Sequence, residues 1–336
     1  MRVVVIDAPR ADAGAAKASQ FLSALLALLL CPAVWAAGAE GPPRFAVAAP
    51  AAGKPLTFVV YGDPRFSRRE DIANSFARRS IVERIAGESP AAILIGGDLV
   101  FQGSDPDDYA TYRRETEAWS QLKIPVFPAL GNHEFKGCPP HNLRACLENW
   151  WLAFRALPLS PYRWYSVTLG PTLLALILDS GAPLKPGSEQ LAWFDRQITG
   201  AEPGIRFILV VLHYPPVRDP LYPRMADERE VARYFSAKAK SLHARVVVVG
   251  SHVHNYERYS RDGVTYLVSG GGGATPIPAP RMFGELSQLT TAVNFHYLRF
   301  TLERDRLTGI MVRFDADHRT GNAWSEPDRF EVRARD

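Results

Sequence analysis

The chain has 336 residues, of which 47% are hydrophobic and 22% charged, so it is long enough to bury a sizeable core in one large domain or two. Its formal net charge of +4 is spread along the chain without a block of lysine and arginine, which argues against specific nucleic-acid binding. This weak positive balance suits an anionic substrate but does not by itself indicate one.

Residues 1–36 are typical of a signal peptide. Basic residues precede an apolar run over 21–30, and the segment 33–36 begins and ends with alanine, as a cleavage site requires. The run is too short for a stable membrane span. We therefore expect a periplasmic or secreted protein. The alternative is a lipoprotein signal ending at Cys31, against which the bulky Leu30 argues.

Export affects how the cysteines are interpreted. Cys138 and Cys146 remain after cleavage and lie close together in the sequence. In an oxidising compartment such a pair predicts a disulfide that closes a small loop, with a stabilisation of roughly 2–3 kcal/mol. Two free, buried thiols are the alternative.

Residues 37–54 are rich in alanine, proline and glycine and predict an extended lead-in, and residues 55–336 predict one mixed α/β domain. The predicted buried strands cover 56–61, 91–95, 125–130, 206–212 and 245–249, and paired strands cover 162–169 and 172–178. Helices are expected at about 70–85, around 112–119, after the capping residue Ser188, and over 229–243. Antiparallel strands are expected over 264–268, 295–303 and 310–315.

Six metal-binding side chains follow the ends of predicted strands. They are Asp63, Asp98, Asn132, His213, His252 and His254. Ligands bind at this edge of open α/β sheets because several loops converge there. Each residue alone has a simpler explanation, such as a helix cap, a turn or a packed histidine. Together they form the carboxylate, amide and imidazole mixture expected for manganese, iron or zinc.

The two histidines after the valine strand alternate in sequence. If the backbone stays extended there, His252 and His254 point the same way and share one metal or serve two adjacent metals. The alternative is a pair of polar residues in a surface loop.

The order of these motifs resembles the calcineurin-like metallophosphoesterase superfamily. The motifs are Gly62-Asp63, Gly97-Asp98, Gly131-Asn132-His133-Glu134, Val211-Leu212-His213 and His252-Val253-His254. The segment 253–258 is most similar to the purple acid phosphatase branch. The resemblance implies a four-layer α/β/β/α sandwich of two mixed sheets, with the motifs on loops at one edge.

The resemblance also implies roles for single residues. Asp98 is expected to bridge two metal ions, and His133 to contact the substrate phosphate. One ion is expected to be completed by Asn132, His213 and His252, and the other by Asp63 and His254. The implied reaction is hydrolysis of a small phosphate ester or a phosphorylated substrate by a metal-bound hydroxide, with one or two ions per chain.

Two residues depart from the family pattern. Arg65 stands where many relatives have a histidine, and Phe101 stands where purple acid phosphatases have a ligating tyrosine. We therefore expect one metal site to be weakened. Arg65 either faces the phosphate and supplies charge, or turns away to an acidic neighbour such as Glu70. The alternative function is a non-catalytic protein that binds phosphate or another anion on the same scaffold.

Overall fold

The computed structural model describes residues 3–5, 41–51, 54–219, 228–277, 295–316 and 323–335. The predicted signal peptide lies outside these ranges, except for β1 (Val3–Val5). Part of the predicted lead-in forms β2 (Arg44–Val47), which pairs with β1 and, in parallel, with β6. No helix among the described residues is long and apolar enough to cross a membrane.

The strands form two mixed sheets. The larger has eight strands in the order β1-β2-β6-β7-β8-β9-β11-β10, and the smaller has six in the order β14-β13-β12-β3-β4-β5. The further strands of the larger sheet are β6 (Tyr165–Leu169), β7 (Leu173–Ile177), β8 (Phe207–Val211), β9 (Arg245–Gly250), β10 (Tyr256–Arg261) and β11 (Val264–Ser269). The smaller sheet contains β3 (Leu56–Tyr61), β4 (Ile93–Ile95), β5 (Val126–Pro128), β12 (Phe295–Leu302), β13 (Arg306–Phe314) and β14 (Trp324–Arg333).

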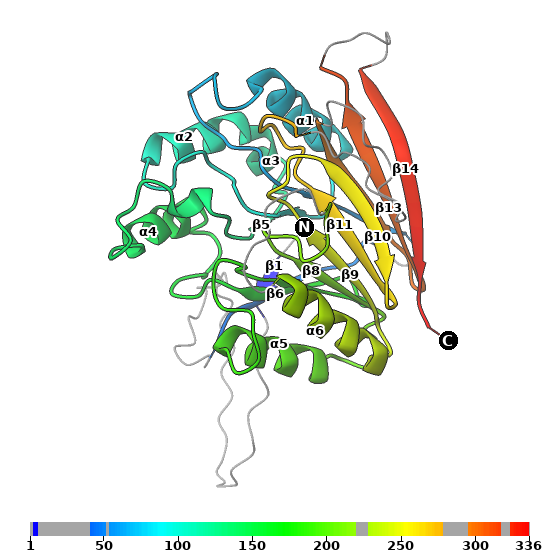
Figure 1. Cartoon of the computed structure of the whole chain (residues 1–336). Coiled ribbons are helices and arrows are strands. Elements are labelled where there is room, and N and C mark those ends of the chain that lie inside the picture. The colour runs from blue at the N-terminus through cyan, green and yellow to red at the C-terminus, as the bar shows by residue number, and fades with distance from the viewer. Residues whose placement is uncertain are drawn as a thin grey trace, which may run out of the picture.

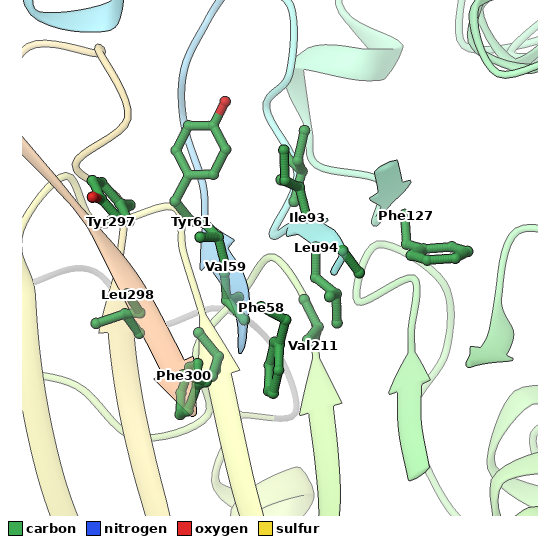
Figure 2. Close-up of a cluster of buried hydrophobic side chains, with 14 of the residues drawn as sticks. Phe58, Val59, Tyr61, Ile93, Leu94, Phe127, Val211, Tyr297, Leu298 and Phe300 are labelled. Carbon is green, nitrogen blue, oxygen red and sulfur yellow. The ribbon is translucent and has the colours of Figure 1, made fainter. Parts of the chain in front are cut away.

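The central strands of the larger sheet are apolar at every position because both of their faces are covered. In β8, Leu209 and Val211 belong to the hydrophobic core between the two sheets, whereas Ile208 and Val210 belong to a second core under the outer helices. Figure 2 shows Val211 beside Phe58, where the two sheets face each other. Because successive side chains of a strand point to opposite faces, one apolar run contributes to both cores.

Helices cover the outer face of each sheet (Figure 1). They are α1 (Ser75–Glu88), α2 (Pro106–Glu115), α3 (Glu117–Gln121), α4 (Arg144–Ala153), α5 (Glu189–Thr199) and α6 (Glu228–Ser241), with a 3-10 turn η1 (His133–Phe135). Helix α1 contacts β12 and β13 of the smaller sheet, and α5 and α6 supply apolar residues to the second core. The predicted four-layer α/β/β/α sandwich is confirmed.

Local side-chain bonds fix the ends of several helices. The carboxamide of Asn74 accepts a hydrogen bond from the N–H of Ala77 and caps α1, and Ser188 caps α5 as predicted. The single helix predicted around 112–119 was wrong, because it is divided at Thr116. The hydroxyl of Thr116 donates to the carbonyl of Tyr112, and its backbone leaves helical geometry.

Neighbouring parallel strands bring the candidate residues to one edge. Strands β3, β4 and β5 are parallel in one sheet, and β7, β8 and β9 are parallel in the other. Asp63 and Asp98 follow β3 and β4, and His213 and His252 follow β8 and β9. The carboxyl ends of these strands in both sheets therefore face the same region.

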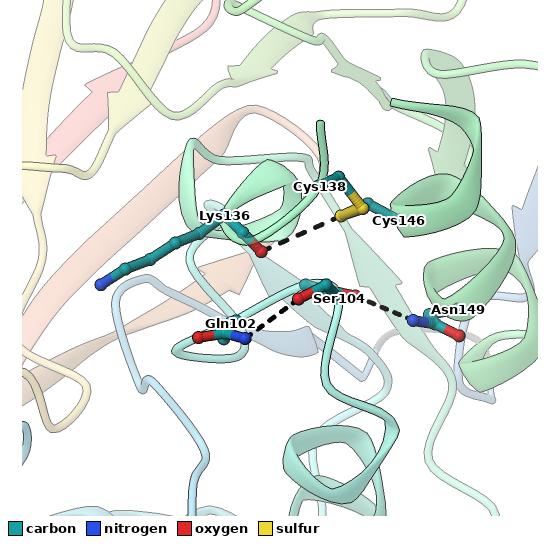
Figure 3. The surroundings of a disulfide bond; sticks show 7 residues. Gln102, Ser104, Lys136, Cys138, Cys146 and Asn149 are labelled. Atoms are coloured by element: carbon teal, nitrogen blue, oxygen red, sulfur yellow. Dashed lines mark hydrogen bonds between the residues drawn. A yellow bond between two sulfur atoms is a disulfide. The ribbon is translucent and has the colours of Figure 1, made fainter. Parts of the chain in front are cut away.

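The structure contains the predicted disulfide between Cys138 and Cys146, whose Cα atoms are 6.1 Å apart. It joins the loop after η1 to helix α4, as Figure 3 shows. Nearby, the side chain of Asn149 in α4 donates to the carbonyl of Gly103 at 3.0 Å. These links hold α4 against the loops that follow β4 and β5.

Candidate metal centre

Four residues at this edge have left-handed backbone geometry. The φ angles are 57° at Asp63, 49° at Arg65, 51° at Asp98 and 66° at His252. This region costs a residue with a side chain about 1–3 kcal/mol, and such strain concentrates at functional sites. Hydrogen bonds between the loops maintain this backbone geometry. The N–H groups of Asp63 and Arg65 donate to the carbonyls of Gly97 and Asp98, both at 3.1 Å.

A first group of ligand atoms converges on the imidazole of His213. Its Nδ1 lies 3.0 Å from the carbonyl oxygen of Gly96, so in the neutral ring Nδ1 carries the proton and Nε2 has a free lone pair. This Nε2 lies 3.0 Å from Asn132 Oδ1, 3.3 Å from Asp98 Oδ1 and 3.2 Å from His252 Nδ1.

These separations fit one metal ion. Bonds of about 2.0–2.1 Å place neighbouring ligand atoms about 3.0–3.4 Å apart in tetrahedral or octahedral geometry. A carboxylate oxygen and an amide oxygen that face an imidazole lone pair repel one another when nothing lies between them. A bound cation turns this repulsion into coordination, so the first group fits a metal.

A second group contains Asp63 and His254. Nδ1 of His254 donates to the carbonyl of Thr275 at 2.7 Å, which directs Nε2 towards Asp63 Oδ1 at 3.6 Å. Both of these facing atoms are buried and have no hydrogen-bond partner within the described ranges. Buried polar atoms without partners are costly, and a shared cation would satisfy both. The side chains of Asp63, Asp98 and His213 offer ligand atoms within 4.8 Å of one another.

The alternating histidines do not act through an extended strand. His252 has a φ of 66°, so the backbone turns there. Its Nδ1 joins the first group, and its N–H donates to Asp63 Oδ2 at 2.8 Å, while His254 reaches the second group. The two imidazoles reach the same site from a turn, so the condition of an extended backbone is not met.

Arg65 points into the site. Its Nη2 lies 3.2 Å from Asp98 Oδ2, the oxygen left free by the first group. The alternative pairing with Glu70 was wrong, since the Glu70 carboxylate accepts a hydrogen bond from Ser75 instead. The Nε of Arg65 is buried and has no hydrogen-bond partner in the described part of the chain. A guanidinium therefore stands beside the carboxylate that was expected to bridge two ions.

His133 lies at the rim of both groups. Its Nδ1 is 2.6 Å from the carbonyl oxygen of Phe101, and its Nε2 is 3.8 Å from Asp98 Oδ2. Phe101 does not ligate; its ring packs beside the imidazole, with centroids 5.3 Å apart. Burial lowers the pKa of His133, and the charge of Asp98 opposes that shift.

The two buried aspartates have opposite pKa shifts. Burial raises the pKa of Asp63, and the negative charge of Asp98 raises it further. Burial also acts on Asp98, but His213, His133 and Arg65 outweigh it and lower the pKa. Two fully buried carboxylates thus share one arginine as a permanent counter-charge, which leaves room for a bound cation.

Glu134 organises the ligand loops, although the sequence motifs assign it no role. Its buried carboxylate accepts backbone hydrogen bonds from Asp98 and Gly131 at 3.0 and 2.6 Å, and from Leu99 and Val100 at 2.8 and 3.4 Å. Burial and the charge of Asp98 raise its pKa to about 8, and these donors oppose the shift because they favour the ionised form. The sequence feature that could have indicated this role is the position of Glu134 directly after Asn132-His133.

Gly131 allows the loops to approach closely. A Cβ atom at Gly131 would lie 2.4 Å from Asp98 Oδ1 and 2.9 Å from His213 Nδ1. Any side chain there would displace two ligand residues. The glycine of this motif is therefore required by packing around the site.

We expect His252 and His254 to contribute stability to the metal-free protein that is lost as the pH falls from about 7 towards 4. Burial, followed by neighbouring positive charges, lowers the pKa of His252 to about 3 and that of His254 to about 4, from an ordinary 6.5. The unfolded chain binds protons below 6.5, whereas the folded chain keeps these rings neutral, so stability is fully present above that value. For His254 alone the loss amounts to about 3 kcal/mol below its folded pKa.

Thermal unfolding of chelator-treated protein between pH 7.5 and 4.5 measures this dependence. His254→Asn should remove the part of the pH dependence that His254 contributes, because asparagine does not titrate. His243→Asn is the matched control, since its ring pairs with Arg206 away from the site. A difference in melting temperature between wild type and His254→Asn that does not change with pH would contradict the prediction.

A curated plant protein is similar in sequence to this chain. The chain is 23% identical over 228 residues to the probable purple acid phosphatase 20 of Arabidopsis thaliana, covering 67% of this chain and 51% of that protein. The chain therefore spans about half the length of this curated relative.

Solved structures share the fold. The purple acid phosphatase PPD1 from yellow lupin (Lupinus luteus) seeds has a TM-score of 0.69 and 16% identity, with 87% of this chain and 56% of that chain covered. GAP50, described as the anchor in the inner membrane complex of Plasmodium, has a TM-score of 0.57 and 16% identity, with 84% and 90% covered.

The family profile of the calcineurin-like phosphoesterases matches residues 56–256, well over half of the chain. This match includes both ligand groups, His133 and Arg65. The chain belongs to the calcineurin-like phosphoesterases, a superfamily whose activity is the hydrolysis of phosphate esters.

Proposed function

We propose that this chain is an exported, metal-dependent phosphoesterase that acts on phosphorylated small molecules or other phosphate esters in the periplasm or outside the cell. The observation that carries the proposal is the convergence of Asp98, Asn132 and His252 on Nε2 of His213 at 3.0–3.3 Å. The hydrogen bond from His213 Nδ1 to Gly96 keeps that lone pair directed at the shared point.

The first group is the stronger of the two metal sites. Its ligands are complete, whereas the second group has Asp63 and His254 but must share Asp98 Oδ2 with the guanidinium of Arg65. A cation at the second position is repelled by this fixed positive charge at short range. We infer that one metal ion is held tightly and that Arg65 supplies part of the second charge.

The residues then have distinct tasks. A metal ion held by Asp98, Asn132, His213 and His252 would supply Lewis-acid chemistry and lower the pKa of a water molecule. Arg65, whose Nε has no partner among the described residues, donates to the phosphoryl oxygens and holds the phosphorus in line. Asp98 orients Arg65 through the ion pair of 3.2 Å.

His133 is placed to handle the leaving oxygen. The Phe101 carbonyl accepts a hydrogen bond from Nδ1–H and fixes the ring, so Nε2 faces the site. A bound phosphate brings negative charge beside the imidazole and favours its protonated form. His133 then donates the Nε2 proton to the leaving oxygen and makes the alcohol a neutral product.

We expect purified protein to contain about one tightly bound metal ion per chain, and the double variant Arg65→His, Phe101→Tyr to contain about two. The double variant removes the guanidinium and adds an imidazole and a phenol, both of which can ligate. Elemental analysis counts the ions. Hydrolysis of 4-nitrophenyl phosphate, with and without added manganese and after chelation, measures the dependence on metal.

Arg68→His is the matched control, because Arg68 is exposed and pairs with Asp107. It should leave the metal count unchanged. Two tightly bound ions in the wild-type chain would contradict the weakened site. Full metal loading without turnover of any ester would instead favour the second candidate, a non-catalytic anion-binding protein, for which the Arg65–Asp98 ion pair is the supporting observation.

A further inference from the structure

A lysine stands over the aromatic ring beside His133. Nζ of Lys136 lies 3.5 Å from the centroid of the Phe101 ring, and the guanidinium carbon of Arg69 lies 5.2 Å from the same centroid. The Phe101 ring also contacts the His133 ring, and the Phe101 carbonyl accepts a hydrogen bond from Nδ1–H of His133. A ring face attracts a cation by its quadrupole, so Phe101 fixes a positive charge at the rim of the site.

The backbone of Lys136 is held from several sides. Its N–H donates to the carbonyl of His133 at 3.1 Å, and its carbonyl accepts from the N–H of Ser104 at 3.1 Å. The disulfide follows directly, with Sγ of Cys146 3.9 Å from the Lys136 carbonyl oxygen. Figure 3 shows the ammonium group extending away from the disulfide. The charge is thus placed by a fixed loop, although the side chain itself is exposed.

Lys136 differs from its basic neighbours in lacking a carboxylate partner. Arg69 pairs with Asp71 at 2.7 Å and Arg65 pairs with Asp98 at 3.2 Å. Within the described ranges, no carboxylate lies at ion-pair distance from the Lys136 ammonium group. Desolvation lowers the pKa of Lys136, and the charges of Arg65 and Arg69 lower it further.

We propose that Lys136, held over Phe101, is a specificity-determining cation that binds a second anionic group on the alcohol of the ester. The inference rests on the proposed function, in which His133 protonates the leaving oxygen. The leaving alcohol then passes beside Phe101, which packs against His133 and carries Lys136 on its ring. A carboxylate or second phosphate there gains a charge partner, whereas a neutral alcohol gains none.

The test compares 3-carboxyphenyl phosphate with 3-carbamoylphenyl phosphate, which have similar shapes and differ in charge. The preference is the ratio of their kcat/KM values. We expect Lys136→Met to lower this preference about three- to fivefold, mainly through KM, since a partly exposed ion pair has an effect of this size. Lys136→Arg should restore most of it, and Phe101→Leu should lower it partly. High salt should reduce the wild-type preference.

Lys240→Met, which removes an exposed lysine on α6, is the matched control and should keep the wild-type preference. Calorimetric binding of 3-carboxybenzylphosphonate and 3-carbamoylbenzylphosphonate separates the two proposals. If the wild-type chain hydrolyses neither ester but binds the carboxylate more tightly in a way that needs Lys136, the proposed function fails and the binding role stands. If both esters are hydrolysed and Lys136→Met leaves their ratio unchanged, the inference is wrong and the function stands.

Discussion

Asp98→Asn is expected to lower kcat/KM for 4-nitrophenyl phosphate by about a thousandfold or more and to reduce the bound metal. The buried carboxylate supplies Oδ1 to the first ligand group, and it orients Arg65 through Oδ2. Asparagine removes the negative charge that attracts both the metal ion and the guanidinium of Arg65. Metal-assisted stabilisation of the transition state contributes several kcal/mol, and each 1.36 kcal/mol is about tenfold in rate.

Asp107→Asn provides the matched control, since this exposed aspartate pairs with Arg68 outside the site. It should keep both the metal and the activity. The circular dichroism and melting temperature of the metal-free Asp98→Asn protein show whether its fold is intact. Activity within about tenfold of wild type in a folded Asp98→Asn protein would be incompatible with the ligand role, because the predicted loss is set by several kcal/mol.

Glu134→Gln is expected to lower the free energy of unfolding by about 3 kcal/mol, the size of effect expected when buried backbone N–H groups lose a hydrogen-bond acceptor. Each hydrogen-bond partner described for its carboxylate is a backbone N–H, contributed by residues 98–100 and Gly131. The amide NH₂ of glutamine would face donors at one of these positions. For a chain of this size the melting temperature should fall by about 5–10 °C.

The same variant should weaken metal binding about 10- to 100-fold, because groups that orient the ligands affect affinity to this extent. Glu117→Gln is the control, since Glu117 is exposed on α3 and accepts only from Gln121 within the described residues. Chemical denaturation and metal titration give the two readouts. A Glu134→Gln protein that melts within about 1 °C of wild type would show that the loops are held by other contacts.

Much of the fold was predictable because its signals are local. The valine run of β9 and the apolar run of β8 are continuous, and both faces of these strands are buried. Ser188 and the following helix were also correct. The strand β14 was missed because Trp324–Arg333 contains the turn-like segment Glu326-Pro327-Asp328, and proline in a strand is tolerated mainly at a sheet edge, where β14 lies.

The residues that converge at the candidate site could also be predicted from the sequence, because each follows a strand that ends at the same edge. Their geometry was not. The bond that orients His213 joins it to a backbone carbonyl 117 residues away, at Gly96. The bond that orients His254 likewise uses the carbonyl of Thr275. Every residue has a backbone carbonyl, so no sequence pattern indicates which carbonyl accepts these hydrogen bonds.

The sequence by itself determined that two aspartates, an asparagine and three histidines meet at the carboxyl ends of two sets of strands, since periodicity and chain order place strand ends. Only the tertiary structure decided that Arg65 pairs with Asp98, that Glu134 ties together the loops around the ligands, and that Lys136 rests on Phe101. These choices depend on loop conformations with positive φ and on contacts between segments distant in sequence. Such contacts are set by the packing of the whole sandwich, which local preferences do not encode.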